Sequence, residues 1–534
     1  MASPITRIAA EFEVLVERAS RLGHLNPTEL VQSYRLLAPA SHALLNDPRR
    51  VDLDALATAL SSLPPDFLDA PRLFLVPRLE LFAHTPIPSV VFPAGRLDDG
   101  TLLIECRFGH ISLVNLAASL AAITLEVEKS RALCNVAGAD VTSQAALAFT
   151  LGVDETGLLQ AHQASGGTLL PLLTGDKPLP DVQIHPSLTT ESVSERATLK
   201  AQRVLGRLAE MGLIGRRLHL WIGSSVVTEC LSPYGRDLRK VLERWAEANP
   251  SSVGDDIAAT GAAAGEDLTY ALAHDFLRTD PNLKRERADA DRTVGILRDE
   301  GDDADFEIID LGRVDPAVAD ARLSPWRFDS AAPVLIRIGL DAEDEEAAGL
   351  KTLLQPLAAQ LDSVSILLDG MAISGQIGAI ILPQLLVRWA GEEKVTVPGA
   401  TPLNPDDVLS FANAVVTQGA VLSVPSASLL SPSLIMDLTR SFGVSALSVG
   451  GAGLVKCLAD ARWSGLLPAV ATLTWSLVST RFASTGRPDL ASLGAQSAVA
   501  VATLRRMLDQ VDREAELPAP TPRPRSGRSV RIKA

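Results

Sequence analysis

The stretch from Gly419 to Ser476 constrains the fold of this chain more than any other part of it. Short apolar runs alternate there with amphipathic ones, at residues 420–424, 434–442, 444–449, 454–461 and 468–473. This order predicts a strand, a helix, a strand, a helix and a strand. The strand segments are continuously apolar, which is typical of parallel sheets covered on both faces. The stretch therefore predicts an α/β domain.

Local signals in this stretch indicate where its helices begin. Ser431 and Pro432 are typical of a helix start, because a serine hydroxyl accepts from free amides and proline needs no partner in the first turn. Leu434 and Leu438 then fall on one helix face. The run 450–453, Gly-Gly-Ala-Gly, turns the second strand into the next helix, which is where open α/β sheets bind ligands.

Length and composition limit the classes of protein to which this chain can belong. A chain of 534 residues makes about two or three domains. A content of 47% hydrophobic and 21% charged residues is typical of a folded soluble protein. The net charge of −15 argues against a general nucleic-acid binder, because phosphate binding needs clustered Lys and Arg. We therefore predict no nucleic-acid partner.

The cysteines and the apolar segments indicate the compartment. Cys106, Cys134, Cys230 and Cys457 have no close pairing and no metal-ligand spacing, so we expect reduced, buried thiols. Residues 5–16 form an amphipathic helix pattern rather than a secretion signal. The near-apolar run 111–125 contains polar residues and falls short of the roughly 20 residues that span a bilayer. We predict a cytoplasmic protein without a membrane segment.

The chain divides into four predicted segments. Residues 1–170 form a mainly helical N-terminal domain with a short β-like interlude at 73–76 and 102–106 and a long helix at 111–133. Residues 171–300 form a middle region with a helix at 194–211 and a strand at 218–222.

The α/β domain is predicted at 301–510, and a basic, Pro- and Arg-rich tail at 511–534 is expected to be disordered. The predicted strands of the domain lie at 334–338, 364–368, 420–424, 444–449 and 469–473. Acidic clusters at 299–310 and 341–346 are interpreted as solvated faces or helix starts rather than metal sites.

Two segments together resemble the nucleoside phosphorylase and nucleosidase superfamily. Residues 364–383 read VSILLDGMAISGQIGAIILP and are similar to the superfamily's strand, glycine turn and second strand. Residues 419–476 are similar in order and spacing to the rest of that core. The resemblance implies a three-layer C-terminal domain with a nucleoside phosphorylase-like sheet, as in uncharacterised bacterial proteins with a helical N-terminal half. It also implies a nucleoside-like ligand and a homo-oligomer.

The residues that carry chemistry in the superfamily are replaced in this chain. Where the superfamily has Met-Glu, whose carboxylate binds the ribose hydroxyls, this chain has Val449 and Gly450. The base-protonating Asp corresponds to Leu477, and the Asp of a Gly-Asp pair corresponds to Ala379. No histidine follows His274, so the α/β domain lacks the commonest acid-base side chain. The resemblance therefore implies a retained fold without catalytic residues.

Candidate ligand-binding residues lie at strand-to-helix turns. Lys456 stands where a dinucleotide loop would need its third glycine, so we predict no cofactor, although Lys456 and free helix amides can contact an anion. We interpret His219 and Cys230 as packed core residues. No metal ligand and no catalytic residue is predicted, and the candidate ligand-binding residues are Ser224, Ser225, Gly370, Ser374, Ser426, Gly450, Gly451, Gly453 and Lys456.

Two functions remain open. The first is a catalytically degenerate nucleoside phosphorylase-like protein that binds a small nucleoside-like ligand or a protein partner. The second is an active enzyme on a nucleoside, nucleotide or related glycoside, with a replacement site in residues 223–234. The cleft between residues 370–376, 426–431 and 449–456 distinguishes the two functions, because an enzyme needs this cleft to be open and lined by polar groups.

Overall fold

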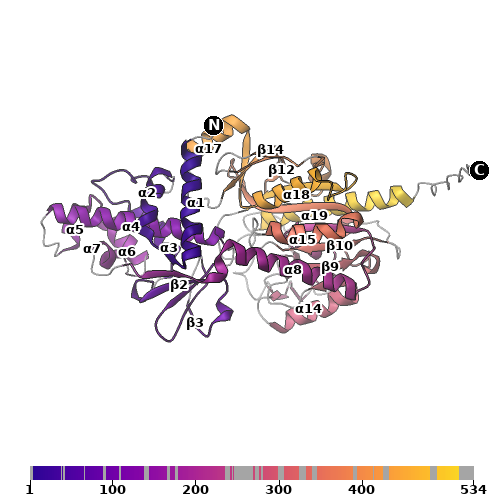
Figure 1. Cartoon of the computed structure of the whole chain (residues 1–534), viewed down its shortest axis with the longest axis horizontal. Helices are drawn as coiled ribbons and strands as arrows, with labels where there is room; N and C mark the ends of the chain where they lie inside the picture. Colours follow the sequence, from indigo (N-terminus) through magenta and orange to yellow (C-terminus); the bar gives the residue numbers. More distant parts are fainter. Residues whose placement is uncertain are drawn as a thin grey trace, which may run out of the picture.

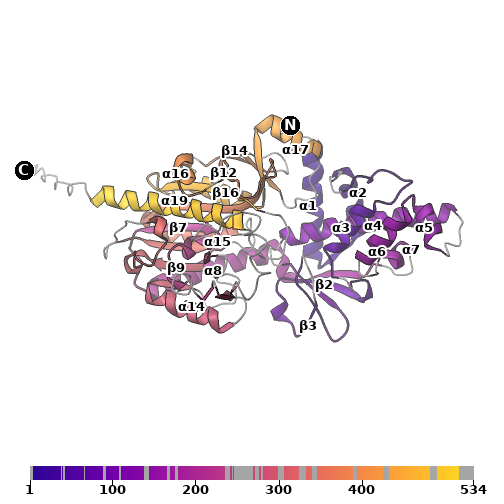
Figure 2. The same cartoon turned by 180° about the vertical axis from the view of Figure 1, so that it is seen from behind.

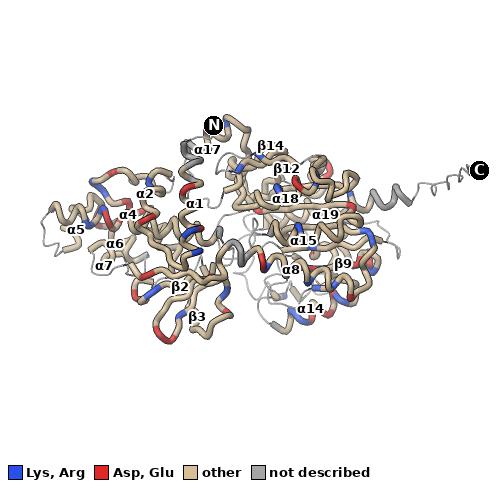
Figure 3. Tube along the Cα trace, viewed as in Figure 1, with Lys and Arg blue, Asp and Glu red and all other residues tan. Residues whose placement is uncertain are grey.

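The computed structural model describes residues 4–515. Within that range it leaves out residues 38, 40–41, 65–66, 88–91, 107–109, 138–142, 165–166, 168, 175–178, 235–240, 243, 246–268, 271–272, 274–275, 278–280, 299–305, 324–331, 340–345, 389–393, 398, 413, 425–431 and 481–489. None of the described helices combines the length and the apolar character that a bilayer span requires. Basic and acidic residues are interspersed over the described trace (Figure 3).

The N-terminal part combines helices with a six-stranded sheet (Figure 1). Its strands pair in the order β1 (His24–Leu25), β6 (Asp181–Ile184), β2 (Arg72–Val76), β5 (Leu102–Glu105), β4 (Ala94–Arg96) and β3 (Thr85–Ile87). Its helices are α1 (Pro4–Leu22), α2 (Pro27–Leu37), α3 (Leu53–Ser61), α4 (His110–Ala137), α5 (Gln144–Leu151), α6 (Glu155–Ala164) and α7 (Leu169–Thr174).

The prediction of a helical half with one β-like interlude missed this sheet. The strands are two to five residues long, so an alternating pattern has no room to develop. The predicted limit at residue 170 also cuts off β6, which pairs with β2 in parallel. The long helix predicted at 111–133 is observed as α4, and its buried residues share one core with Leu73 and Leu75 of β2.

The second part is built on a ten-stranded sheet. Its strands follow the order β13 (Lys394–Val395), β12 (Ile380–Arg388), β14 (Val416–Val424), β15 (Val444–Val449), β11 (Leu361–Ala372), β7 (Leu218–Gly223), β10 (Val334–Ile338), β9 (Phe306–Asp310) and β8 (Ile296–Arg298). The tenth strand, β16 (Thr472–Ser479), pairs with both β11 and β12. The strands β11, β15, β14, β12 and β16 therefore close into a ring.

Several sequence predictions are corrected by this sheet. It includes β7 and β8, so it begins before residue 301, where the α/β domain was predicted to start. The strand predicted at 469–473 is observed instead as β16, which begins at Thr472, because the residues between Pro468 and Ala471 form a turn. The other four predicted strands lie within β10, β11, β14 and β15.

Helices cover both faces of the large sheet. On one face, α8 (Thr190–Glu210), α15 (Glu346–Leu357) and α18 (Ala452–Trp463) share a core with Leu220 and Ile222 of β7. On the other face, α9 (Val226–Glu229) and α19 (Leu490–Ala515) share a core with Trp221. Figure 2 shows α19 lying across this second face. The other helices whose bounds the structure describes in full are α14 (Pro281–Thr293), α16 (Pro405–Leu409) and α17 (Pro432–Phe442).

The helix α19 also corrects the predicted tail. It continues to Ala515, beyond the limit predicted at residue 510. The rest of the predicted tail, residues 516–534, lies outside the described residues, as does most of the two acidic clusters.

The N-terminal part packs directly on the large sheet. Its core cluster continues into Leu422 of β14, Leu447 of β15 and Leu438 of α17, all of which are buried. In Figure 1, α17 lies beside the start of α1. The two parts thus share a continuous apolar core.

Substituting Gly223, at the end of β7, tests how closely the backbones of β7 and β11 pack. Its φ of 115° lies in the region that favours glycine, and a Cβ there would lie 2.0 Å from the carbonyl oxygen of Leu367. We expect Gly223→Ala to lower the free energy of unfolding by about 3 kcal/mol, measured by urea denaturation. Gly465→Ala is the control, because Gly465 has a φ of 75° and no atom near its missing Cβ. Equal losses in the two variants would contradict the packing argument.

Candidate functional site

Four parallel strands, β7, β10, β11 and β16, end at one edge of the large sheet. Gly223 of β7 pairs with Leu367 of β11, and Gly370 of β11 pairs with Ser479 of β16. The carboxyl ends of parallel strands are the usual place for ligands in α/β sheets. The antiparallel strand β15 joins this edge, because its Ser448 pairs with Gly370.

A chain of side-chain hydrogen bonds connects the ends of β7 and β11 through α19. Ser224 Oγ donates to Gln496 Oε1 at 2.8 Å, and Gln496 Nε2 donates to Asp369 Oδ1 at 2.7 Å. Gln496 is buried, whereas Asp369 is exposed. The amide of Gln496 therefore orients an exposed carboxylate at the end of the central strand.

The sequence analysis missed both Asp369 and Gln496. Asp369 directly follows the apolar strand segment 364–368 and precedes Gly370, which is a signal that the sequence does contain. Gln496 lies in an Ala- and Ser-rich helix more than 100 residues away in sequence, and no local pattern marks it.

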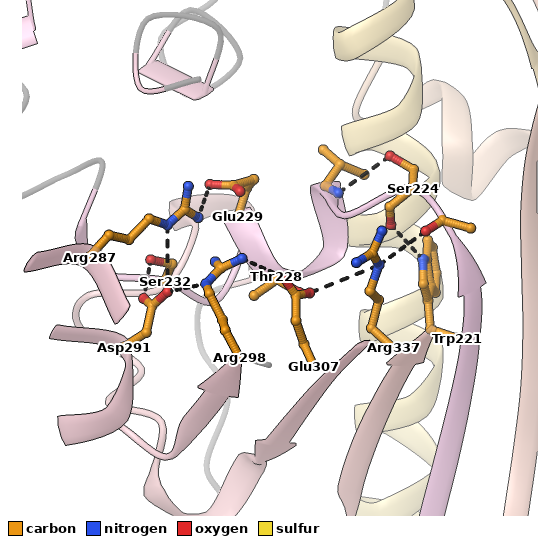
Figure 4. Close-up of polar contacts among 12 residues, drawn as sticks. Trp221, Ser224, Thr228, Glu229, Ser232, Arg287, Asp291, Arg298, Glu307 and Arg337 are labelled. Carbon is orange, nitrogen blue, oxygen red and sulfur yellow. Dashed lines mark hydrogen bonds and ion pairs between the residues drawn. The ribbon is translucent and has the colours of Figure 1, made fainter. Parts of the chain in front are cut away.

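The turn after β7 is held by its own strand and by the neighbouring one. Trp221 Nε1 donates to the carbonyl oxygen of Ser224 at 2.8 Å, and Arg337 Nε of β10 donates to the carbonyl oxygen of Gly223 at 3.1 Å. Ser225 stands before the short helix α9 and makes no side-chain capping bond. Figure 4 shows how these contacts converge on the turn.

A buried network of ion pairs lies beside this turn and anchors α9. Arg298 bonds to Glu307 through Nη1 and to Asp291 Oδ2 through Nε at 2.6 Å. Arg287 Nη2 lies 2.5 Å from Glu229 Oε2, and Arg337 Nε lies 4.0 Å from Glu307 Oε2. Three arginines thus face three carboxylates (Figure 4), so the network is balanced in charge.

Two of the hydroxyl groups in the predicted replacement site, residues 223–234, donate hydrogen bonds to carboxylates of this network. Thr228 Oγ1 donates to Glu307, and Ser232 Oγ donates to Asp291 Oδ1 at 2.5 Å. Burial opposes the charge of Arg298, but the nearby carboxylates of Glu307 and Asp291 outweigh it and raise the pKa of Arg298. The network is therefore a fixed structural anchor rather than a reactive group.

The predicted glycine positions have different environments. A Cβ on Gly370 would lie 2.4 Å from the carbonyl oxygen of Leu447 and 2.6 Å from Leu477 Cδ1, so this glycine serves close packing. Gly450 and Gly451 have φ values of 88° and 85° and form the turn into α18. Ser423 Oγ of β14 donates to the carbonyl oxygen of Gly450 at 2.8 Å and fixes this turn.

The structure brings together most of the predicted ligand-binding residues. Ser224, Ser225, Gly370, Gly450, Gly451 and Gly453 lie at the ends of the adjacent strands β7, β11 and β15. Lys456 follows in α18 with an exposed side chain, and Ser374 lies in an exposed turn after β11. Ser426 and the segment 426–431 lie outside the described residues, so the cleft defined with them is not fully described.

His219 and Cys230, which the sequence analysis interpreted as packed core residues, are both buried. His219 is 1% exposed, and its Nδ1 lies 2.7 Å from Ser363 Oγ, while its Nε2 has no hydrogen-bond partner. Burial, and secondarily the charge of Arg217, lowers the pKa of His219 to about 3. Cys230 is fully buried, and no disulfide joins it to Cys106, Cys134 or Cys457. Within the described part of the chain, no group of three or more His, Cys, Asp or Glu is placed to hold a metal ion.

Comparisons with known proteins give only distant structural matches. No protein-family model matches the sequence, and no curated protein matches it. The Campylobacter jejuni 5'-methylthioadenosine/S-adenosylhomocysteine nucleosidase is 9% identical over 55% of this chain and all of its own, with a TM-score of 0.30. A futalosine hydrolase mutant of Helicobacter pylori is 10% identical over 55% of this chain and 99% of its own, with a TM-score of 0.29.

A third solved structure, uridine phosphorylase isoform 2 of Schistosoma mansoni, is 8% identical over 55% of this chain and 87% of its own, with a TM-score of 0.29. TM-scores and identities this low carry no conclusion about the activity of this chain.

Proposed function

We propose that the protein binds a small nucleoside-like ligand at the ends of β7, β11 and β15 and does not cleave a glycosidic bond. The observation that supports binding is the exposed carboxylate of Asp369, held by Gln496, which Ser224 holds in turn. A carboxylate accepts hydrogen bonds from sugar hydroxyls, and these charge-assisted bonds are among the stronger ones in proteins.

The absence of cleavage follows from the side chains at the four positions that the sequence resemblance marks. Cleaving an N-glycosidic bond requires charged groups aimed at the developing charges on the sugar and the base. Val449, Gly450, Ala379 and Leu477 carry no charge, and Ala379 and Leu477 are buried. His219 is buried too, and a pKa near 3 leaves it neutral at pH 7.

The alternative of an enzyme with a replacement site in 223–234 gains no support from the hydroxyl groups of Ser224, Thr228 and Ser232. Thr228 and Ser232 donate their hydroxyl hydrogens to buried carboxylates, and Ser224 donates to Gln496. A nucleophile needs a base that can take its proton, and these hydroxyls are paired with groups fixed by other bonds.

Binding is tested by thermal unfolding and calorimetry with adenosine, inosine and uridine. A nucleoside at about 100 times its Kd should raise the free energy of unfolding by roughly 2.7 kcal/mol. We expect Asp369→Asn to weaken this binding roughly ten- to a hundredfold, because the acceptor loses its charge. Asp406→Asn, at an exposed carboxylate of α16, is the control.

Cleavage is tested in parallel by assaying release of the free base, with and without phosphate. We expect no release. Base release that is abolished by substitutions within 223–234 would contradict the proposal and favour the enzyme alternative. A failure of every nucleoside to bind would contradict the binding role itself.

A further inference from the structure

A cleft of about 80 Å³ lies in the N-terminal part, between the last turns of α1 and the first turn of α2. The two helices lie side by side (Figure 1), and the short strand β1 connects them. The volume is well above the roughly 10 to 15 Å³ that one water molecule needs, so the cleft can hold a group of several atoms.

The floor of this cleft is apolar. Leu25 and Leu30 are 2% exposed, and Leu15 and Ala19 complete the floor from α1. Leu15 and Ala19 are four residues apart, so they lie on one face of the helix. Ala19 has the shortest side chain in the lining, which leaves space for an apolar group of a ligand between the two helices.

Two opposite charges line the cleft without pairing with each other. Arg18 of α1 and Glu29 of α2 are both exposed. Among the described residues, the side chain of Arg18 forms no hydrogen bond or ion pair, and that of Glu29 is bonded only by Asn26 Nδ2, which donates to Oε1 at 3.2 Å. Arg21 of α1, in contrast, pairs with Glu17 at 2.7 Å. The guanidinium of Arg18 and the second carboxylate oxygen of Glu29 are therefore open to a ligand.

One class of small molecule engages both charges and the apolar floor. A free amino acid carries an ammonium, a carboxylate and a side chain on one carbon atom. The guanidinium of Arg18 suits the carboxylate, because its parallel N–H groups match two carboxylate oxygens. Glu29 suits the ammonium, which donates hydrogen bonds and accepts none. Ligand sites commonly combine such an apolar lining with a few polar groups that fix the orientation of the ligand.

We propose that this cleft binds a free amino acid with an apolar side chain, such as leucine, valine or methionine. Arg18 holds its carboxylate, Glu29 holds its ammonium, and its side chain enters the apolar floor. The site goes beyond the proposed function, because it lies in the N-terminal part and shares no residue with the ends of β7, β11 and β15.

The test uses the full-length protein and calorimetry with ligands that each lack one of the recognised groups. Leucine should bind. Leucinamide, which lacks the carboxylate, and isocaproate, which lacks the ammonium, should bind roughly tenfold more weakly, because each loses one charge-assisted contact. Glycine lacks the apolar side chain and should bind more weakly than leucine. D-Leucine has the same three groups in mirror-image order, so it should also bind more weakly.

Charge-neutral variants assign each contact. Arg18→Gln should weaken leucine binding roughly tenfold and leave leucinamide binding unchanged, because leucinamide has no carboxylate for Arg18. Glu29→Gln should weaken leucine binding by a similar factor and leave isocaproate binding unchanged. Arg21→Gln and Glu11→Gln are the matched controls, since both residues are exposed on α1 and neither lines the cleft. All four substitutions lie at exposed positions, so the Tm of the free protein should stay nearly the same.

Three results would overturn the inference. If leucine, valine and methionine all fail to bind, an amino acid is not the ligand. Equal affinities for leucine, D-leucine and leucinamide would indicate a nonspecific apolar surface. Leucine binding that is lost in Asp369→Asn and retained in Arg18→Gln would place the amino acid at the strand ends of the large sheet. Nucleoside binding is measured separately, so the proposed function and this inference can fail independently.

Discussion

Below pH 6.5 the buried imidazole of His219 should cost the protein about 1.4 kcal/mol of stability for each pH unit. The folded state holds the pKa of His219 at about 3, against an ordinary value of 6.5. Between these two values the unfolded chain binds a proton that the folded chain does not, so stability falls as the pH falls. The loss should approach roughly 5 kcal/mol near pH 3.

The measurement is urea denaturation of the wild type and of His219→Gln at several pH values between 7 and 4. The variant cannot gain this proton, so the difference in unfolding free energy between the two proteins should change with pH by the slope given above. His24→Gln is the control, because the side chain of His24 is 51% exposed and its pairing with Asp181 lies at the surface, where the loss of an ion pair costs under about 1 kcal/mol. A pH-independent difference between wild type and His219→Gln would show that this histidine is not held neutral.

Glu307→Gln should lower the free energy of unfolding by about 3 to 5 kcal/mol. Glu307 is fully buried and accepts from Arg298 and Thr228, and Arg337 lies 4.0 Å away. Removing its charge leaves Asp291 as the carboxylate that pairs with Arg298, and one positive charge of the buried network is then unbalanced. Urea denaturation at pH 7 measures the loss, and it should also be visible as a lower Tm.

An exposed ion pair supplies the control for Glu307. Asp289 and Arg292 of α14 lie 3.0 Å apart with side chains 73% and 50% exposed, so Asp289→Asn should cost under about 1 kcal/mol. The double variant Glu307→Gln with Arg298→Gln should recover part of the loss, because it removes both charges. A loss below about 1 kcal/mol in Glu307→Gln would mean that solvent reaches this network.

The helices and strands that could be predicted from the sequence are those whose signals lie within a few neighbouring residues. The strand at 444–449 and the helix beginning at Pro432 match β15 and α17, because a continuous apolar run and a Ser-Pro start both act over a few residues. The six-stranded sheet was missed, since strands such as His24–Leu25 are too short to show a period. The membership of β7 in the large sheet depends on pairing with β11, which lies more than 100 residues further along the chain.

Only part of the candidate site could be predicted, again because sequence signals act over a few neighbouring residues. Glycine turns such as 450–453 carry a local signal, and the structure places them at strand ends as expected. Side-chain bonds such as that between Gln496 and Asp369, and the ion pair between Arg298 and Glu307, arise only when separate elements meet. No pattern within one element encodes these contacts, so only the structure reveals them.

The ring formed by β11, β15, β14, β12 and β16 has a consequence for how copies of this protein can meet. The terminal strands of the large sheet are β13 and β8, and those of the small sheet are β1 and β3, each only two or three residues long. Aggregation and strand exchange between copies need a long unpaired strand at the edge of a sheet, because a strand of another molecule pairs with it there. Any assembly of this chain through its described residues should therefore join helices and loops, and it should leave each sheet complete within one molecule.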